Sequence, residues 1–228
     1  MRSTPRLLLF DIDGTLLDCG GQSRPLLVDA LVAVYGTAGS AAVCDFAGKT
    51  DDQIVHESLA GTDLPTDRVE AGLGRAKERY LERLERRLDR AGMRLHAGVE
   101  ELLTALAGRG DLAVGLLTGN WEAGARIKLD RYGLGRFFSF GAFGDGCRDR
   151  RELPPVALSR AGEWAATSFR PEETVIIGDT TRDVECGRAH GIAVLAVTTG
   201  THDGERLAAA GADWVVDGLG AATACLGL

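Results

Sequence analysis

Short, continuously apolar runs recur along this chain, and they constrain its fold more than any other feature. Each run is bounded by turn residues, as is typical of strands buried in a parallel sheet. Helical patterns separate most of the runs, and this alternation predicts a doubly wound parallel α/β sheet. The expected strands are Leu7–Phe10, Leu112–Leu117, Phe138–Phe143, Thr174–Ile177, Ala193–Val197 and Trp214–Val216. The expected helices between them are Val99–Ala107, Glu122–Tyr132, Pro155–Ala161, Asp183–His190 and Gly204–Ala210.

The alternation stops between residues 18 and 93, where the sequence contains only helical patterns. These cover Pro25–Tyr35, Asp51–Leu59 and the amphipathic segment Asp67–Arg90. We predict an all-helical cap of residues 18–93 inserted into an α/β core of residues 1–17 and 94–228. Because the insertion follows the first strand, the cap would lie over the carboxyl end of that strand. Gly20 and Gly21 would form a flexible joint between cap and core.

Two aspartates, Asp11 and Asp13, directly follow the first apolar run. In open α/β sheets, ligands bind just beyond the carboxyl ends of the strands. Residues at i and i+2 of an extended segment point to the same side, so the two carboxylates would lie together. Burying two unpaired carboxylates is costly. The pattern therefore indicates a cation between them, and a divalent ion is the simplest choice.

Two further strand ends carry polar residues. Thr118-Gly119-Asn120 closes the run Leu112–Leu117, and its hydroxyl, backbone N–H and carboxamide suit the oxygens of a phosphate. A strand that ends in Thr-Gly is also compatible with a plain turn. Asp179 follows the run Thr174–Ile177, and Asp183 follows four residues later, where it also suits the start of a helix. Together with the aspartates after the first strand, these residues would form one polar rim.

The segments Phe10–Thr15, Thr118–Asn120 and Gly178–Asp183 resemble the signature motifs of the haloacid dehalogenase-like hydrolases. More narrowly, they are similar to the phosphoglycolate phosphatase-like phosphatases that carry a helical cap. The resemblance covers essentially the whole chain, and it implies a Rossmann-like core. It also implies an enzyme that hydrolyses a small phosphorylated metabolite.

The resemblance assigns roles to the rim residues. Asp11 would be the nucleophile that forms an aspartyl-phosphate, and Asp13 would be the general acid and base. Mg²⁺ would be held by Asp11 and Asp179, with the backbone carbonyl of Asp13 as a further ligand and Asp183 as direct or indirect support. The phosphoryl group would be bound by Thr118, Gly119 and Asn120.

One motif departs from the family pattern. The family places a lysine after the third strand, but this chain has no lysine between Cys147 and Pro155. An arginine would take over the role, and the alignment of Pro155 with the start of the next helix favours Arg150, with Arg151 as a near alternative. Lys128, on the helix after Asn120, is interpreted as a surface cation.

The cap contains a segment, Gly48-Lys49-Thr50, that we predict to face the active site. Lys49 would then bind an anionic group of the substrate. An equally simple interpretation is a helix start capped by Thr50.

Composition excludes several classes of protein. A net charge of −7 argues against binding of nucleic acid, which requires a basic face. The apolar runs are far shorter than the roughly 20 residues needed to span a bilayer, and the first residues do not resemble a secretory signal. We therefore expect a cytoplasmic monomer or small homo-oligomer that does not bind membranes.

Other functions remain open from the sequence. A phosphosugar mutase would share Asp13, and an enzyme that cleaves a C–P bond would need a cap lysine such as Lys49 or Lys77. A 2-haloacid dehalogenase has no need of Asp13 or of Mg²⁺. A non-catalytic binding protein on the same fold is a further alternative. The sequence does not encode which metabolite is the substrate.

Overall fold

The computed structural model describes residues 6–227, so residues 1–5 and 228 of the predicted core lie outside the described part of the chain. Its main sheet is parallel, with the strand order β5-β4-β1-β6-β7-β8. Because β1 lies in the middle, between β4 and β6, three strand ends that carry polar residues are neighbours. The strands are β1 (Leu7–Phe10), β4 (Ala113–Leu117), β5 (Gly141–Ala142), β6 (Thr174–Gly178), β7 (Ala193–Val197) and β8 (Trp214–Val216).

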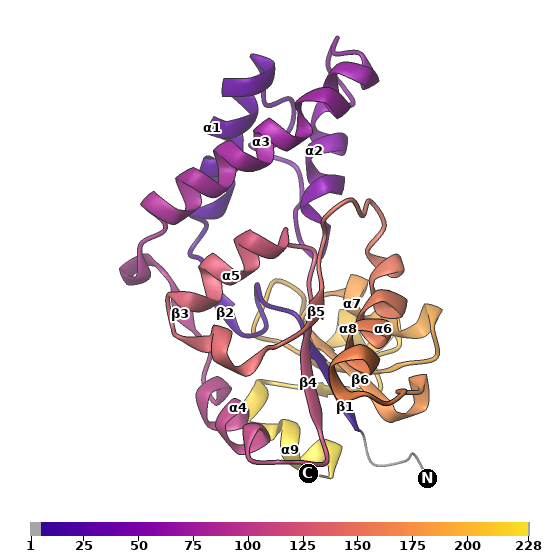
Figure 1. Ribbon diagram of the computed structural model, residues 1–228. Helices are drawn as coiled ribbons and strands as arrows, with labels where there is room; N and C mark the ends of the chain where they lie inside the picture. Colours follow the sequence, from indigo (N-terminus) through magenta and orange to yellow (C-terminus); the bar gives the residue numbers. More distant parts are fainter. Residues whose placement is uncertain (1–5, 228) are drawn as a thin grey trace.

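Helices cover both faces of the sheet, which confirms the doubly wound α/β prediction (Figure 1). Alternate residues of β1 point to opposite faces, so Leu8 and Phe10 join one hydrophobic core while Leu7 and Leu9 join the other. The first core is closed by α4 (Val99–Ala107), α5 (Glu122–Asp130) and α9 (Ala222–Leu226). The second is closed by α6 (Leu153–Ala165), α7 (Thr181–Ala189) and α8 (Gly204–Ala210).

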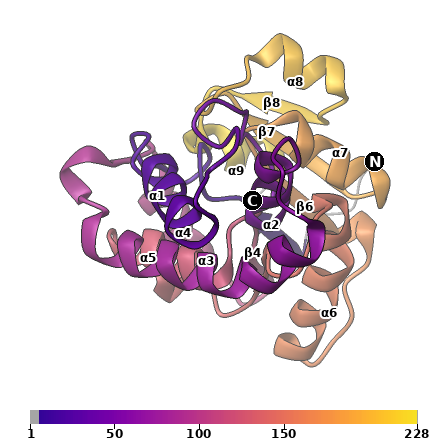
Figure 2. The same ribbon diagram turned by 90° about the horizontal axis from the view of Figure 1, so that it is seen from above.

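Three helices, α1 (Ser23–Tyr35), α2 (Asp51–Leu59) and α3 (Thr66–Arg87), form a separate group beyond the carboxyl ends of the strands (Figures 1 and 2). The ring of Tyr35 on α1 packs against Gly72 on α3, and its hydroxyl donates to the Val69 carbonyl at 2.7 Å. Any larger residue at position 72 would collide with that ring.

The chain enters and leaves this helical group through two adjacent segments. β2 (Leu17–Asp18) and β3 (Arg94–Leu95) pair as a short antiparallel ribbon. Beyond the ribbon, the Gln22 side chain donates to the Asp89 carbonyl at 3.0 Å and accepts from the Asp89 N–H at 2.9 Å. Gly20, with φ of 60°, lies so close to the Gly92 carbonyl that a side chain would not fit.

The expected strand Phe138–Phe143 is shorter than predicted. Only Gly141–Ala142 pairs with β4, and β5 is the edge strand with a single neighbour. The aromatic residues that suggested a longer strand, Phe138, Phe140 and Phe143, are buried as core side chains instead. The expected helix Asp67–Arg90 also ends earlier, because Leu88 adopts an extended conformation.

The longest helix, α3, is rich in charged residues. Within residues 6–227, no helix combines the length and the apolar character needed to cross a membrane.

Candidate active site

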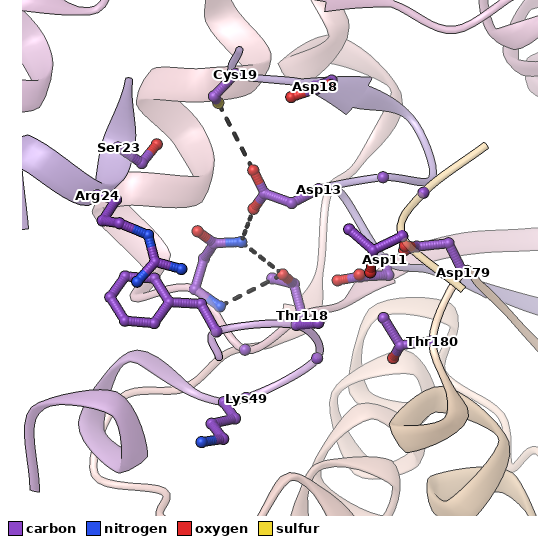
Figure 3. Close-up of a pocket in the computed structure, with 18 of the residues that line it drawn as sticks. Asp11, Asp13, Asp18, Cys19, Ser23, Arg24, Lys49, Thr118, Asp179 and Thr180 are labelled. Atoms are coloured by element: carbon purple, nitrogen blue, oxygen red, sulfur yellow. Dashed lines mark hydrogen bonds between the residues drawn. The ribbon is translucent and has the colours of Figure 1, made fainter. Parts of the chain in front are cut away.

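A cavity of about 420 Å³ lies between the strand ends and the helical group (Figure 3). Its floor contains Asp11 and Asp13 after β1, Thr118 after β4 and Asp179 after β6. Its roof is formed by residues of α1 and of the loop before α2. The rim predicted from the sequence is therefore one continuous surface beneath the helices.

Three aspartates form a buried carboxylate cluster. Asp11, Asp179 and Asp183 each place an oxygen within 4.8 Å of the others. Their approach requires three glycines, because a side chain at Gly14 or Gly200 would collide with the Asp179 carboxylate and one at Gly178 would collide with Asp183. Gly14 also has φ of 86°, a backbone conformation that glycine adopts without strain.

Arg150 is the cation buried against this cluster. Its Nη2 lies 3.1 Å from Asp11 Oδ1 and 2.5 Å from Asp183 Oδ1, and its side chain is 4% exposed. Arg151, the next residue, instead pairs with Asp149 and has a side chain that is 61% exposed. Of the two arginines that the spacing allowed, the structure brings Arg150 into the site and places Arg151 outside it.

The carboxylate cluster is electrostatically strained. Burial raises the pKa of Asp11, and the Asp183 and Asp13 charges add to this, while Arg150 opposes it. Burial also raises the pKa of Asp179, again with support from the neighbouring carboxylates. One guanidinium cannot compensate three carboxylates, so the cluster favours a further cation.

The donor set suits a hard divalent ion such as Mg²⁺, which prefers carboxylate and carbonyl oxygens. Asp183 is already occupied by other donors: Arg150 binds Oδ1, and the Thr180 N–H and hydroxyl bind Oδ2 at 2.9 and 2.6 Å. Asp11 and Asp179 are less fully bonded, although Asp179 Oδ1 accepts from Thr15 at 3.1 Å. They are therefore the better ligands, with Asp183 holding Arg150 in place.

Asp13 belongs to a second network. Its Oδ2 accepts from Asn120 Nδ2 at 2.7 Å and from Lys128 Nζ at 2.6 Å, and the Cys19 thiol lies 3.6 Å from Oδ1. Burial alone would raise the pKa of Asp13, but the Lys128 charge and these hydrogen bonds hold it below its usual value. The side chain remains 41% exposed, so it can reach a bound molecule.

Lys128 corrects the sequence-based interpretation, because it is not a surface cation. Its side chain is 4% exposed, and its Nζ also donates to Asn120 Oδ1 at 2.6 Å. The sequence contained a signal that was missed. Lys128 follows Gly124 by four residues and precedes Leu129, so it lies on the buried face of α5.

The Thr118-Gly119-Asn120 segment makes a side-chain hydrogen bond within itself and backbone contacts with the loop before α2. Asn120 Nδ2 donates to the Thr118 hydroxyl oxygen at 2.8 Å, which leaves the hydroxyl proton for another acceptor. Gly119 lies against the backbone of Lys49 and Thr50, where a side chain would collide. Its carbonyl accepts from the Asp51 N–H at 2.8 Å.

Lys49 lines the cavity as predicted, but its Nζ donates a hydrogen bond to Glu57 Oε2 at 2.5 Å. Thr50 also caps α2, accepting from the Gln53 N–H at 3.1 Å, so both sequence interpretations describe part of the geometry. A cavity residue that the sequence did not reveal is Arg24 on α1, which stacks over Phe46 at 3.8 Å.

The first turn of α2 attaches the helical group to the core. Asp51 Oδ2 accepts from the Trp121 N–H at 2.8 Å, and Asp52 Oδ1 accepts from the Trp121 indole N–H at 2.5 Å. The Thr50 hydroxyl donates to the Cys147 carbonyl at 2.6 Å. These contacts close the roof directly over the strand ends.

Comparisons with known proteins agree with this architecture. The family model described as "Haloacid dehalogenase-like hydrolase" matches residues 8–197. The phosphoglycolate phosphatase of Synechococcus elongatus is 31% identical over 213 residues, covering 92% of each chain. Phosphoglycolate phosphatase 1 of Pseudomonas aeruginosa is 30% identical, covering 94% of this chain and 77% of the relative. The structure of CbbY from Rhodobacter sphaeroides in complex with phosphate has the same fold, with a TM-score of 0.73 at 18% identity over 98% of this chain and 100% of that one.

Proposed function

This chain belongs to the haloacid dehalogenase-like hydrolases and is a phosphatase, and we propose that it hydrolyses a small phosphorylated metabolite through an aspartyl-phosphate on Asp11. One observation carries the proposal above all others. Asp11 shares a buried cluster with Asp179 at the floor of the cavity, while Asp13 faces the same cavity from a separate network.

In the first step, a carboxylate oxygen of Asp11 attacks the phosphorus atom, and the bond from phosphorus to the ester oxygen breaks. Asp13, a carboxylate in the free protein, would take up the proton of the phosphate monoester monoanion and pass it to the departing oxygen, so the product alcohol leaves neutral. Arg150 and the Thr118 hydroxyl would balance the charge on the phosphoryl oxygens.

In the second step, Asp13 takes a proton from a water molecule as the water oxygen attacks phosphorus. The bond from phosphorus to the Asp11 oxygen breaks, which releases inorganic phosphate and restores the Asp11 carboxylate. The different surroundings of the two aspartates suit these different roles, since Asp11 is 4% exposed and Asp13 is partly open to the cavity.

We propose that Asp11 and Asp179, with the backbone carbonyl of Asp13, hold Mg²⁺. When bound, the ion would offset the negative charge of the phosphoryl group and of the cluster. The excess of carboxylates over Arg150 at this place is what supports the assignment.

The proposed substrate is phosphoglycolate or a metabolite of similar size. The cavity volume of about 420 Å³ lies in the range of small-molecule sites, and the helices of residues 18–93, acting as a lid, would exclude a folded phosphoprotein. Two relatives that are at least 30% identical are phosphoglycolate phosphatases. The reaction of a 2-haloacid dehalogenase does not need Asp13, so it would not explain why Lys128 and Asn120 bind this carboxylate.

Phosphate release from a panel of phosphorylated metabolites, with and without Mg²⁺, tests the proposal. We expect Mg²⁺-dependent release, with phosphoglycolate among the good substrates, and loss of release in Asp11→Asn. Activity that survives Asp11→Asn would exclude the assigned nucleophile. Isomerised sugar phosphates among the products would indicate a mutase instead.

A further inference from the structure

We infer that Lys128 is a positioning residue that holds Asp13 in place for proton transfer to the leaving oxygen. The inference rests on the proposed function, because it concerns the residue assigned as acid and base. Three features carry it: the contacts of Lys128, the orientation it imposes on Asn120, and its burial.

The contacts join Lys128 directly to the carboxylate. Its Nζ donates to Asp13 Oδ2 at 2.6 Å, on the same oxygen that Asn120 Nδ2 binds at 2.7 Å. With two donors on Oδ2, the carboxylate cannot rotate freely about its side-chain bonds. The other oxygen, Oδ1, is then directed away from these donors, where only the weak Cys19 thiol donor is recorded among the described contacts.

Lys128 also determines how the Asn120 carboxamide is oriented. An ammonium can only donate, so the oxygen of Asn120 must face Nζ, at 2.6 Å. The amide nitrogen must then face Asp13 and Thr118, to which it donates at 2.7 and 2.8 Å. The Asp13 carboxylate favours the same orientation, so removing Lys128 would leave the amide held through its nitrogen and would take away the donor that its oxygen accepts from.

Burial indicates that the lysine is not present for packing. Its side chain is 4% exposed, and a buried ammonium is costly unless it is paired. An apolar side chain such as methionine would fill the same space on the buried face of α5 without that penalty. The charge is therefore explained by its partners, which both line the cavity.

The test compares two substrates with different leaving groups. An alkyl phosphate such as 2-phosphoglycolate needs a proton on its leaving oxygen, whereas p-nitrophenyl phosphate releases a phenolate that is stable without one. For Lys128→Met we expect kcat/KM to fall about 10- to 100-fold on the alkyl phosphate and less than about threefold on the aryl phosphate. The ratio kcat/KM reports only the steps up to aspartyl-phosphate formation. The rate of the later hydrolysis therefore does not affect the comparison of the two substrates.

Two further variants show whether Lys128 acts through Asp13. Asp13→Asn should produce the same selective loss on the alkyl phosphate, and adding Lys128→Met to it should cause little further loss. Lys128→Arg should restore part of the activity, because it keeps a donor and a charge. Arg79→Met, at a cationic side chain of α3 that is 58% exposed and pairs with Glu82, is the matched control and should change neither rate by more than about twofold.

An equal fall on both substrates, or additive losses in the double variant, would overturn the inference and indicate a purely structural lysine. An unchanged kcat/KM on the alkyl phosphate would overturn it as well. Failure of the proposed function is distinguishable, because the wild-type protein would then release phosphate from neither substrate.

Discussion

At the scale of single residues, the central fact of the site is that one arginine faces three buried carboxylates. Arg150 contacts Asp11 and Asp183 directly, and the side chains involved are at most 5% exposed. A planar guanidinium can bind two carboxylates at once with fixed geometry, which an ammonium does less well. Removing it would leave like charges together at a buried place.

Arg150→Ala should therefore lower the free energy of unfolding by about 3–5 kcal/mol in the absence of divalent ions, because it leaves buried carboxylates unpaired. Phosphatase activity should be lost in the same variant. Thermal or urea unfolding in the presence of a chelator measures the first effect, and phosphate release measures the second.

Arg151→Ala is the matched control, since this neighbouring side chain is exposed and pairs only with Asp149 among its recorded ion pairs. We expect a change within about 0.5 kcal/mol and normal activity. Equal effects of the two substitutions would contradict the assignment of Arg150 to the site.

The sequence located the aspartates of the rim and favoured Arg150 through the position of Pro155, but it left Arg151 as a near alternative. Arg150 and Arg151 lie in a 3-10 helix of three residues, Arg150–Glu152, and no sequence pattern specifies which side of so short a helix faces the site. Lys128 was misinterpreted for another reason. A single lysine within a helix is normally solvated, and its burial becomes evident only when the face that contains Gly124 and Leu129 is recognised as the core face.

At the scale of elements, the start of α2 is the main attachment of the helical group to the strand ends. Its first two residues, Asp51 and Asp52, both accept from Trp121, which is 1% exposed. The Trp121 ring also meets Tyr80 of α3 edge-on, with centroids 5.7 Å apart. Trp121 therefore connects the core to two of the three helices above it.

Trp121→Phe keeps an aromatic ring but removes the indole donor from buried Asp52. We expect stability to fall by about 1–3 kcal/mol, because a buried acceptor is left without its partner. We also expect KM to rise, because the closed arrangement is favoured less. Calorimetry and steady-state kinetics measure the two effects.

Trp164→Phe provides the comparison, because Trp164 is 54% exposed and lies away from the cavity lining. Its KM should match that of the unsubstituted protein. A lowered KM in Trp121→Phe would show that the contact does not favour closure.

The regular elements followed from hydrophobic patterning. β1, β7 and β8 have the predicted bounds, as do α2, α4 and α8. The ribbon of β2 and β3 was not predicted, because each strand has two residues and no periodicity can appear over that length. The edge strand β5 was overestimated because its aromatic residues pack into the core rather than extend the ladder.

At the scale of the whole molecule, the carboxylate cluster links stability to pH. Burial and mutual repulsion raise the pKa of Asp11 to about 6 and that of Asp179 to about 8 in the folded protein. In the unfolded chain the pKa values of these carboxyls are near 4. Between about pH 4 and pH 8 the unfolded chain therefore binds fewer protons than the folded protein. By linkage, the free energy of unfolding of the metal-free protein falls as pH rises from about 4 to 8. The pKa of Asp13 is lowered, so its protonation would change the free energy of unfolding only at pH values below this range.

We expect the metal-free protein to be less stable at pH 8 than at pH 5 by at least about 1 kcal/mol. Added Mg²⁺ should raise the unfolding temperature more at pH 8, because protons compete for the same oxygens at pH 5. Thermal unfolding with Mg²⁺ and with a chelator, at both pH values, measures this.

Asp179→Asn removes one charge of the cluster. It should weaken both the dependence of stability on pH and the rise of the unfolding temperature with Mg²⁺. A response to Mg²⁺ that is unchanged by this substitution would place the ion elsewhere.

The two segments that connect the helical group to the core run side by side: β2 pairs with β3, and Gln22 after β2 is hydrogen-bonded to Asp89 before β3. This arrangement has a consequence for how such proteins diversify. Since the polypeptide departs from and rejoins the sheet domain at neighbouring points, the intervening helices form a module whose exchange leaves the rest of the backbone path intact. A chimera in which a foreign lid replaces the stretch between Asp18 and Arg94 would keep the phosphorus chemistry and inherit a new choice of metabolite.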